Sequence, residues 1–486
     1  MRAFRWSVIL FFLVLVPSGN QADEFIRNLI VNYSDFSYVS SIAVGYEYVY
    51  FGTSNGVIRY NISFDKWDDP LTGIEGLGNQ VIHDIRASFD DENVWVKTDA
   101  GIYKYIETFR RWDPDDELPQ PDEHNIHLLP DPHYFAPWGY NYMPNGALVD
   151  DYGRIYQITD IVKDNWTHLW LGTWGLGPAR ADETGRMIEL LNYGLLGTNM
   201  AVICNDGGRL WIGGPADDSY RNGVTIYDWN NNIFQYIEPT PDLINTAIDI
   251  NDISVNSREA FVATDNGLWV IDKNELTIVR RLTRRSGLTD DRVLSVLATE
   301  NNIYAGTEYG LGIIDINDDS TAQMVQTILP SRIIYCLEKM DNDLWIGTDQ
   351  GVFRKGLTTG RVERLTAREA VQFGRIFDIK NTSNKIWISG DELISIEKGS
   401  AEVEVFPEME SYSGVYCVAV RDTILALGTG KGLVINFGGR NPYNRLFTIG
   451  DGLLSNDIRD LIFDGDYLWL ASDSGLTRFW YLNPAL

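Results

Sequence analysis

The chain has 486 residues and a formal net charge of −28, from 40 basic and 68 acidic residues. An acidic surface of this kind repels phosphate backbones, so nucleic acid is excluded as a partner class. The three cysteines, Cys204, Cys336 and Cys417, are too few and too widely spaced to form a disulfide framework.

The first 22 residues have the layout of a secretory signal peptide. Two arginines precede the apolar run SVILFFLVLV (7–16), and small and polar residues lead to a cleavage point near Ala22. The apolar run is too short to span a bilayer, no later stretch is long enough to do so, and no cysteine lies near Ala22 to carry a lipid anchor. We therefore expect a signal peptide over residues 1–22 and a periplasmic or secreted mature chain over 23–486, without membrane insertion.

The mature chain repeats one short segment ten times, mostly at intervals of forty to fifty residues. The copies are VYFGTSNGVIRY (49–60), VWVKTDAGIYKY (94–105), LWLGTWGLG (169–177), LWIGG (210–214) with GVTIYD (223–228), AFVATDNGLWVI (260–271), IYAGTEYGLGII (303–314), LWIGTDQGVFRK (344–355), IWISGDELISI (386–396), LALGTGKGLVI (425–435) and LWLASDSGLTRF (468–479). A repeat of this length is typical of propellers and solenoids.

Each copy predicts an antiparallel hairpin. Two β-rich segments flank a turn such as Ser54-Asn55-Gly56, where glycine can take positive φ and an Asn or Asp can bond its own backbone. Strand residues that are apolar on both faces, such as Leu344, Trp345 and Ile346, predict sheets covered on both sides. The large aromatic residue of most copies can fill the wedge between neighbouring sheets, and burying each ring stabilises the fold by roughly 2–3 kcal/mol.

Further strands lie before and after each hairpin, giving four per repeat, and this pattern predicts an all-β fold of β-propeller type. The chain runs out after the third strand of the last copy (LTRFWYL), whereas it opens with a spare strand, FIRNLIVNY (25–33). The spare strand can complete the last blade, which favours a closed propeller over an open solenoid. We expect one ring of about ten blades, with two smaller propellers threaded through each other as the alternative.

One position of the strand before each hairpin is a candidate for the central channel. It holds Ser41, Asp84, Asp160, Val202, Asp252, Ser295, Cys336, Asp378, Cys417 and Asp460 in the ten copies. The five carboxylates, Asp84, Asp160, Asp252, Asp378 and Asp460, would face the axis and either bind a ligand or accept hydrogen bonds within the blades. Because valine, serine and cysteine share the position, the second interpretation is favoured.

The interval between the second and third copies holds a Pro- and aromatic-rich insertion, residues 113–152. It contains seven of the 17 prolines and three of the five histidines, and its prolines argue against a regular blade strand. A long insertion is either a binding loop at the rim or a cap over an exposed strand edge. The candidate ligand-binding residues are His133, Tyr134, Trp138, Tyr140 and Tyr142. The spacing of His124, His127 and His133 matches no standard metal site, and no metal is expected.

The repeats resemble those of the two-component regulator propeller family. The stretch GLLSNDIRDLIFDGDYLWLASDSGLTRF (452–479) carries the glycine-leucine turn, the Asp-bearing strand and the hairpin in sequence. The resemblance covers almost the whole mature chain and implies an exported propeller, as in periplasmic ligand sensors and in cell-envelope and secretion-associated proteins. The sensor pattern continues into an immunoglobulin-like module, a membrane span and a kinase, which this sequence lacks before Leu486.

These features predict an exported, non-enzymatic propeller that binds a ligand or a partner protein and acts as a sensor or scaffold. The partner would be a glycan, a peptide or an envelope protein, and no cofactor is expected. Two alternatives remain: a carbohydrate-active hydrolase or lyase that uses channel carboxylates, and an accessory protein of secretion or envelope assembly. The sequence contains no G-x-S-x-G elbow, P-loop or H-E-x-x-H motif.

Overall fold

The computed structural model describes residues 30–72, 77, 80–91, 93–131, 133–217, 221–239, 247–316, 323–365, 374–398, 402–412, 414–437 and 443–482. The predicted signal peptide, residues 1–22, lies outside this part of the chain. Within the described residues the regular elements are β-strands and short 3₁₀ helices. The predicted all-β class is therefore confirmed.

Three sheets form a body that we call the three-blade unit. Their strands, in sheet order, are β2 (Val39–Val44), β3 (Tyr48–Thr53), β4 (Gly56–Asn61) and β5 (Lys66–Trp67); β6 (Asp84–Ala87), β7 (Val94–Lys97), β8 (Ile102–Ile106) and β9 (Arg111–Asp115); and β11 (Tyr140–Met143), β12 (Ala147–Asp150), β13 (Ile155–Lys163), β14 (His168–Thr173), β15 (Pro178–Asp182) and β16 (Ile188–Leu190). The short strand β10 (Ile126–His127) also pairs with β13, and the 3₁₀ helix η2 (Glu107–Phe109) joins β8 to β9. Strand β2 contacts both β6 and β13, so its blade is the middle one of the three.

Seven further sheets form a body that we call the seven-blade ring. Their strands are β17 (Val202–Asp206), β18 (Arg209–Gly213), β19 (Val224–Asp228) and β20 (Ile233–Ile237); β21 (Ile250–Val255), β22 (Glu259–Thr264), β23 (Gly267–Asp272) and β24 (Thr277–Leu282); β25 (Val293–Ala298), β26 (Asn302–Thr307), β27 (Gly310–Asp315) and β28 (Gln323–Ile328); β29 (Ile334–Met340), β30 (Asp343–Thr348), β31 (Gly351–Gly356) and β32 (Val362–Arg364); β33 (Ile376–Asn381), β34 (Lys385–Gly390), β35 (Ile394–Glu397) and β36 (Val403–Val405); β37 (Val415–Arg421), β38 (Ile424–Thr429), β39 (Gly432–Phe437) and β40 (Tyr443–Phe447); and β41 (Ile458–Asp464), β42 (Tyr467–Ser472), β43 (Gly475–Phe479) and β1 (Ile30–Tyr33). Three 3₁₀ helices lie in its connections: η3 (Arg284–Ser286), η4 (Pro407–Tyr412) and η5 (Ile449–Asp451).

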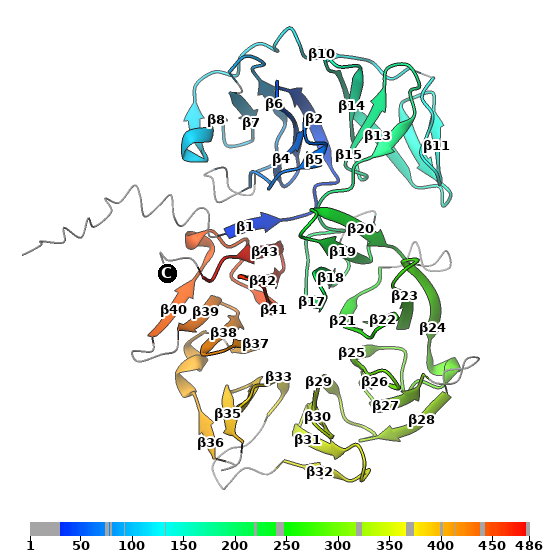
Figure 1. Cartoon of the computed structure of the whole chain (residues 1–486), viewed down its shortest axis with the longest axis vertical. Helices are drawn as coiled ribbons and strands as arrows, with labels where there is room; N and C mark the ends of the chain where they lie inside the picture. Colours follow the sequence, from blue (N-terminus) through cyan, green and yellow to red (C-terminus); the bar gives the residue numbers. More distant parts are fainter. Residues whose placement is uncertain are drawn as a thin grey trace, which may run out of the picture.

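The N-terminal strand closes the ring. Strand β1 pairs antiparallel with β43, with Asn32 opposite Thr477, and the Thr477 hydroxyl donates a hydrogen bond of 2.8 Å to the Asn32 side-chain oxygen. The innermost strand β17 contacts β21 on one side and β41 on the other, so seven blades surround one axis (Figure 1). The predicted latch is confirmed, whereas the prediction that about ten blades share one ring is wrong. The chain leaves the ring after β1, builds the three-blade unit and returns at β17, which is closer to the alternative of two smaller bodies.

All ten predicted hairpins form, and in several of them a threonine side chain fixes the turn. The Thr348 hydroxyl accepts a hydrogen bond from the backbone N–H of Gln350 at 3.0 Å and donates one to the carbonyl oxygen of Gly351 at 2.7 Å. Gly351 has a φ of +98°, which glycine adopts at little cost. The same two bonds recur at Thr53, Thr264, Thr307 and Thr429. The side chain that holds these turns is therefore threonine, and not the Asn or Asp that the sequence suggested.

The glycine before that threonine lets neighbouring blades approach closely. A Cβ atom on Gly347 would lie 2.3 Å from the sulfur of Cys336 and 2.8 Å from the Ile376 side chain, which belongs to the next blade. Aromatic side chains fill the wider part of the wedge, as predicted: Trp170, Trp211 and Trp469 are fully buried. The repeated L-W-I-G-T letters thus encode contacts between blades as well as the hairpin itself.

Candidate functional site

The insertion at residues 113–152 adds strands to the third blade. Strand β12 pairs with the first half of β13, and β10 pairs with its last two residues. The expectation that prolines exclude blade strands from this segment is wrong. Strand β11 lies between Pro137 and Pro144, and strand β12 follows Pro144, so neither strand contains a proline that would remove a backbone hydrogen-bond donor. The insertion therefore covers a strand edge, which is the capping role that the sequence left open.

Part of the insertion also ties the inner strands of the three-blade unit together. The Asn125 side-chain amide donates a hydrogen bond of 3.0 Å to the carbonyl oxygen of Val44 in β2. Nδ1 of His127 lies 2.9 Å from a carboxylate oxygen of Asp160 in β13, and this partner raises the pKa of His127. The other oxygen of Asp160 accepts a hydrogen bond from the backbone N–H of Ile42 at 2.9 Å. Asp160 is thus held by contacts inside the three-blade unit.

The five predicted rim residues do not form one exposed face. Trp138 is 100% exposed, and His133 is exposed beside Asp131. Tyr134 is buried, with its ring centroid 5.5 Å from that of Tyr142, while Tyr140 packs at 6.2 Å from Tyr156. Three of the five side chains therefore hold the insertion together, and a ligand contact through Trp138 and His133 stays a prediction.

The predicted channel aspartates are divided between the two bodies. Asp252, Asp378 and Asp460 lie on innermost strands of the seven-blade ring, whereas Asp84 and Asp160 lie in the three-blade unit. Asp84 accepts a hydrogen bond of 3.2 Å from the Ser41 hydroxyl and pairs with Arg86. The expectation of five carboxylates around one axis is wrong, because the ten blades are not in one ring.

Each aspartate of the ring binds the adjacent blade. Asp252, Asp378 and Asp460 accept hydrogen bonds from the backbone N–H groups of Val296 at 2.7 Å, Val418 at 3.0 Å and Ile203 at 2.7 Å, respectively. The bond from Ile203 to Asp460 joins the first and the last blade. Burial raises the pKa of Asp252 to about 7 and that of Asp460 to about 6. These contacts are the structural role that the sequence favoured.

Serine and cysteine at the same position make the reverse bond. The Ser295 hydroxyl donates to the carbonyl oxygen of Ile334 at 3.3 Å, and the Cys417 thiol lies 3.9 Å from the carbonyl oxygen of Ile458. Each partner belongs to the next blade. Either an acceptor for an N–H group or a donor to a carbonyl can fasten two blades here, which explains why the position tolerates such different side chains.

The axis of the ring is a channel of about 600 Å³ that contains further charged residues. Glu338 and Lys380 line it two residues after Cys336 and Asp378, on the same face of their strands. Burial raises the pKa of Glu338 to about 7. The Lys380 ammonium lies 3.3 Å from a carboxylate oxygen of Asp378, which is the main cause of the raised pKa of Lys380. The sequence analysis missed both residues, although the two-residue period of a strand could have found them.

Bulged residues of adjacent inner strands form an aromatic row along one part of the channel wall. Tyr335, Phe377 and Tyr416 each sit at a register shift in their strand. Their ring centroids are 6.5 Å apart for the first pair and 6.3 Å apart for the second. The next bulged residue is Arg459, which is paired with Asp457 at 3.0 Å. The channel thus combines carboxylates, one lysine and a row of aromatic faces.

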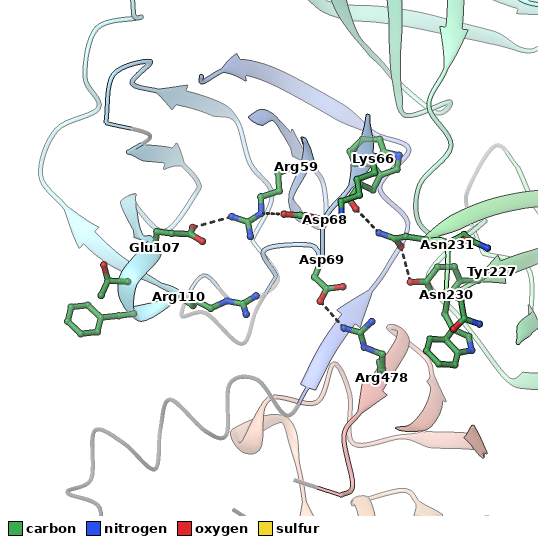
Figure 2. A pocket seen from close by; sticks show the side chains of 15 residues that line it. Arg59, Lys66, Asp68, Asp69, Glu107, Arg110, Tyr227, Asn230, Asn231 and Arg478 are labelled. Atoms are coloured by element: carbon green, nitrogen blue, oxygen red, sulfur yellow. Dashed lines mark hydrogen bonds and ion pairs between the residues drawn. The ribbon is translucent and has the colours of Figure 1, made fainter. Parts of the chain in front are cut away.

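A second cavity, of about 550 Å³, lies where the two bodies meet, and we call it the junction pocket (Figure 2). Its lining residues are Arg59, Lys66, Trp67, Asp68, Asp69, Glu107, Thr108, Phe109 and Arg110 from the three-blade unit, and Tyr227, Trp229, Asn230, Asn231, Asn232 and Arg478 from the seven-blade ring. Only the tertiary arrangement brings these segments together, so no sequence signal could have found this pocket.

Several hydrogen bonds cross the junction beside the pocket. Arg478 of the ring donates to Asp69 of the three-blade unit at 2.8 Å, and the Asn232 amide donates to the carbonyl oxygen of Trp67 at 3.0 Å. Beneath them, the Tyr33 hydroxyl of β1 donates to Asp69 at 3.2 Å and accepts from the Tyr227 hydroxyl at 3.0 Å. The strand that closes the ring therefore also supports the pocket floor.

Among the described residues, no three His, Cys, Asp or Glu side chains are grouped so that they could hold a metal ion. In the same residues, no helix has the length and apolar character needed to cross a bilayer.

Comparison with known proteins gives structural neighbours but no match by sequence. No family model and no curated protein matches the chain. PorZ, a surface component of the type-IX secretion system of Porphyromonas gingivalis, shares 13% identity over 91% of this chain and 74% of PorZ, with a TM-score of 0.50. The extracellular domain of BT4673 from B. thetaiotaomicron shares 14% identity over 91% of this chain and 70% of that domain, with a TM-score of 0.46. At these identities the likeness concerns the fold, and that fold is the repeated propeller blade expected from the two-component regulator propeller family.

Proposed function

We propose that this chain is an exported, non-enzymatic propeller that binds a ligand bearing an amino group in the axial channel of the seven-blade ring. The observation that carries the proposal is the composition of the channel wall. Four carboxylates, those of Asp252, Glu338, Asp378 and Asp460, line it together with Lys380. Among the described lining residues the other cationic group is Arg459, and it is paired with Asp457.

The wall thus has more carboxylates than cations, and the raised pKa values of Asp252 and Glu338, both about 7, reflect how poorly their charges are solvated. An ammonium group of a ligand would supply the missing positive charge through charge-assisted hydrogen bonds. The aromatic row of Tyr335, Phe377 and Tyr416 offers π faces to the same ligand. A channel of about 600 Å³ has the size of a small-molecule site.

The hydrolase or lyase alternative finds less support in this geometry. Acid–base catalysis needs carboxyl groups that exchange protons with a substrate. Asp252, Asp378 and Asp460 each accept hydrogen bonds from the backbone of their own strand and of the next blade. Binding without catalysis is the function that such fixed acceptors serve best.

Export is supported by the predicted signal peptide at residues 1–22 and by the likeness to PorZ, a bacterial surface component. The same likeness makes a role in secretion or envelope assembly the second candidate. A pull-down from envelope extracts with the mature chain tests it: recovery of secretion components that depends on an intact fold would favour the second candidate over a small-molecule receptor.

Matched probes test the channel proposal. We expect glucosamine to bind at least about tenfold more tightly than N-acetylglucosamine at pH 7.5, or triglycine more tightly than N-acetyltriglycine, because only the first member of each pair carries an ammonium group. Isothermal titration calorimetry measures both pairs. Glu338→Gln should remove the preference, while the control Glu363→Gln on the outer strand β32 should keep it. Equal affinity within both pairs would contradict the proposal.

The pH dependence gives an independent check. Since Glu338 and Asp252 have pKa values of about 7, both carboxyls take up protons as the pH falls from 8 to 6. Affinity for ethanolamine, whose ammonium group stays charged throughout this range, should therefore decrease on acidification, and its binding at pH 7 should displace protons from the channel. Titrations in two buffers with different ionisation enthalpies measure that proton release.

A further inference from the structure

The loops between the first and second strands of the blades differ between the two bodies. Each of these loops in the three-blade unit contains one aromatic residue. They are Tyr46 in residues 45–47, Phe89 in residues 88–93 and Trp166 in residues 164–167. The seven corresponding loops of the ring contain only glycine and polar or charged residues. A blade connection therefore needs no aromatic side chain, and the three rings of the three-blade unit have another role.

The three rings meet at the surface of the unit, and we call Tyr46, Phe89 and Trp166 the aromatic triad. The ring centroid of Tyr46 lies 5.6 Å from that of Phe89 and 6.0 Å from that of Trp166, and the last two are also 6.0 Å apart. His124 of the insertion stacks on Phe89 at 4.3 Å. Tyr46 is nevertheless 62% exposed and Trp166 39% exposed. The triad thus presents a contiguous apolar surface to solvent, which is typical of an interaction site.

Backbone hydrogen bonds fix the triad in position. Asp164 is buried, and its carboxylate accepts a hydrogen bond of 2.8 Å from the backbone N–H of Trp166. The next residue, Thr167, has a φ of +83°, an unfavourable conformation for a β-branched side chain. Asp122 holds the second loop by accepting a hydrogen bond of 3.0 Å from the backbone N–H of Phe89. Strain that is held by surrounding contacts occurs preferentially at binding sites, and fixed rings lose little conformational entropy when a partner binds.

The surroundings of the triad are acidic. The three loops and residues 122–124 of the insertion contain seven Asp or Glu residues and no Lys or Arg. Asp122 and Asp164 hold the loops, whereas Asp90, Asp91 and Glu123 are exposed. An anionic partner would be repelled by these charges, and a neutral one would leave them without a counter-charge. Charge complementarity therefore favours a cationic partner.

We propose that the aromatic triad is a docking site for a basic segment of a partner protein, in which arginine side chains stack on the rings. A guanidinium group is planar and weakly hydrated, so it stacks on aromatic faces better than the ammonium group of lysine does. The other cationic side chains of the segment would lie along the exposed carboxylates. The site belongs to the three-blade unit and is separate from the axial channel.

Two peptides of equal charge test the stacking. Fluorescence anisotropy with the full mature chain should give N-acetylated hexaarginine about fivefold tighter binding than N-acetylated hexalysine. Tyr46→Ser should remove most of this preference. The matched control is Tyr309→Ser, at a tyrosine of the ring that is 59% exposed, and it should keep the preference. Both tyrosines are exposed, so the variants should fold, and a thermal melt checks that they do.

A charge variant and a sugar complete the test. Asp90→Asn/Glu123→Gln should weaken both peptides alike, because it removes two exposed charges and leaves the rings in place. Equal affinity for the two peptides would overturn the proposal. So would a preference that Tyr46→Ser leaves unchanged, or peptide binding that does not respond to the charge variant. Binding of cellohexaose that Tyr46→Ser abolishes would make the triad a carbohydrate platform and would also overturn it.

Discussion

The bond between the last and the first blade of the ring gives the sharpest prediction. Asp460 accepts two backbone hydrogen bonds, from Ile203 at 2.7 Å across the closure and from Leu461 at 2.8 Å in its own strand. A hydrogen bond to a charged group contributes about 1.5–3 kcal/mol, and channel water can replace part of what is lost. We expect Asp460→Ala to lower the free energy of unfolding by about 2–4 kcal/mol. Asp460→Asn should cost less, since its amide oxygen still accepts one bond.

Urea unfolding at pH 7.5 measures the loss, and hydrogen exchange shows where it falls. The pH is chosen above 6 because burial raises the pKa of Asp460 to about 6. The backbone amide of Ile203 should exchange faster in Asp460→Ala. The backbone amide of Val418, which donates its hydrogen bond to Asp378 elsewhere in the ring, should change little. If the Ile203 amide exchanges as slowly in the variant as in the wild type, Asp460 does not fasten the closure and the reasoning is refuted.

Three further predictions concern packing, protonation and the insertion. Gly347→Ala should destabilise the ring by about 1–3 kcal/mol in urea, because a Cβ atom there would lie 2.3 Å from the Cys336 sulfur; Gly450→Ala, with no atom closer than 3.4 Å, is the control and should cost far less. His127 stabilises the insertion through Asp160, and its pKa is raised, so this stability is fully present below the unfolded pKa of about 6.5 and is lost as the pH rises through the folded pKa. His127→Gln should flatten that pH dependence in thermal melts, and an unchanged profile would argue against the pair. Tyr134→Ala should cost about 3 kcal/mol because the side chain is buried, whereas Trp138→Ala, at a fully exposed side chain, should leave the melting temperature unchanged; equal effects would mean that the insertion packs differently.

Local features of the fold could be predicted from the sequence because each repeat carries its own turn and its own blade contacts. The threonine and glycine of LWIGTDQG close the turn at Gly351 and admit Ile376 of the next blade, and both act within or next to one repeat. The role of the segment 25–33 as a latch could also be predicted, since a three-stranded last copy needs a fourth strand. Strand β1 supplies it within that segment.

The division into seven and three blades could not be predicted in the same way. Nearly identical hairpins pack as neighbours in either body, so the repeats do not say which blade follows which around an axis. The connections between blades decide this division. Tyr193, between β16 and β17, stacks on Trp67 with ring centroids 4.6 Å apart, and its hydroxyl donates a hydrogen bond of 2.7 Å to the carbonyl oxygen of Asp68. These contacts hold the segment that returns the chain to the ring. The junction pocket forms only because the chain returns to the ring in this way, so it could not be predicted from the sequence either.

The channel residues were partly predictable. Asp252, Asp378 and Asp460 were found from their place in the repeat, and their bonding to backbone follows from the crowding of inner strands. Glu338 and Lys380 occur in single repeats, so no pattern across copies marked them, and only the two-residue strand period counted from Cys336 and Asp378 points to them. Their importance comes from sharing one lumen with the aspartates, which is a property of the closed ring.

The closure of the seven-blade ring by β1 encloses the axial channel, and a cross-link tests it most directly. Asn32 and Thr477 face each other across β1 and β43, with their side-chain oxygens 2.8 Å apart. We predict that the variant Asn32→Cys/Thr477→Cys forms a disulfide rapidly under mild oxidation of the folded protein, as seen by peptide mass spectrometry, and that this bond raises the urea midpoint. A folded variant in which these two cysteines stay reduced after prolonged oxidation, as shown by alkylation once the protein is unfolded, would contradict the closure and the channel that it encloses.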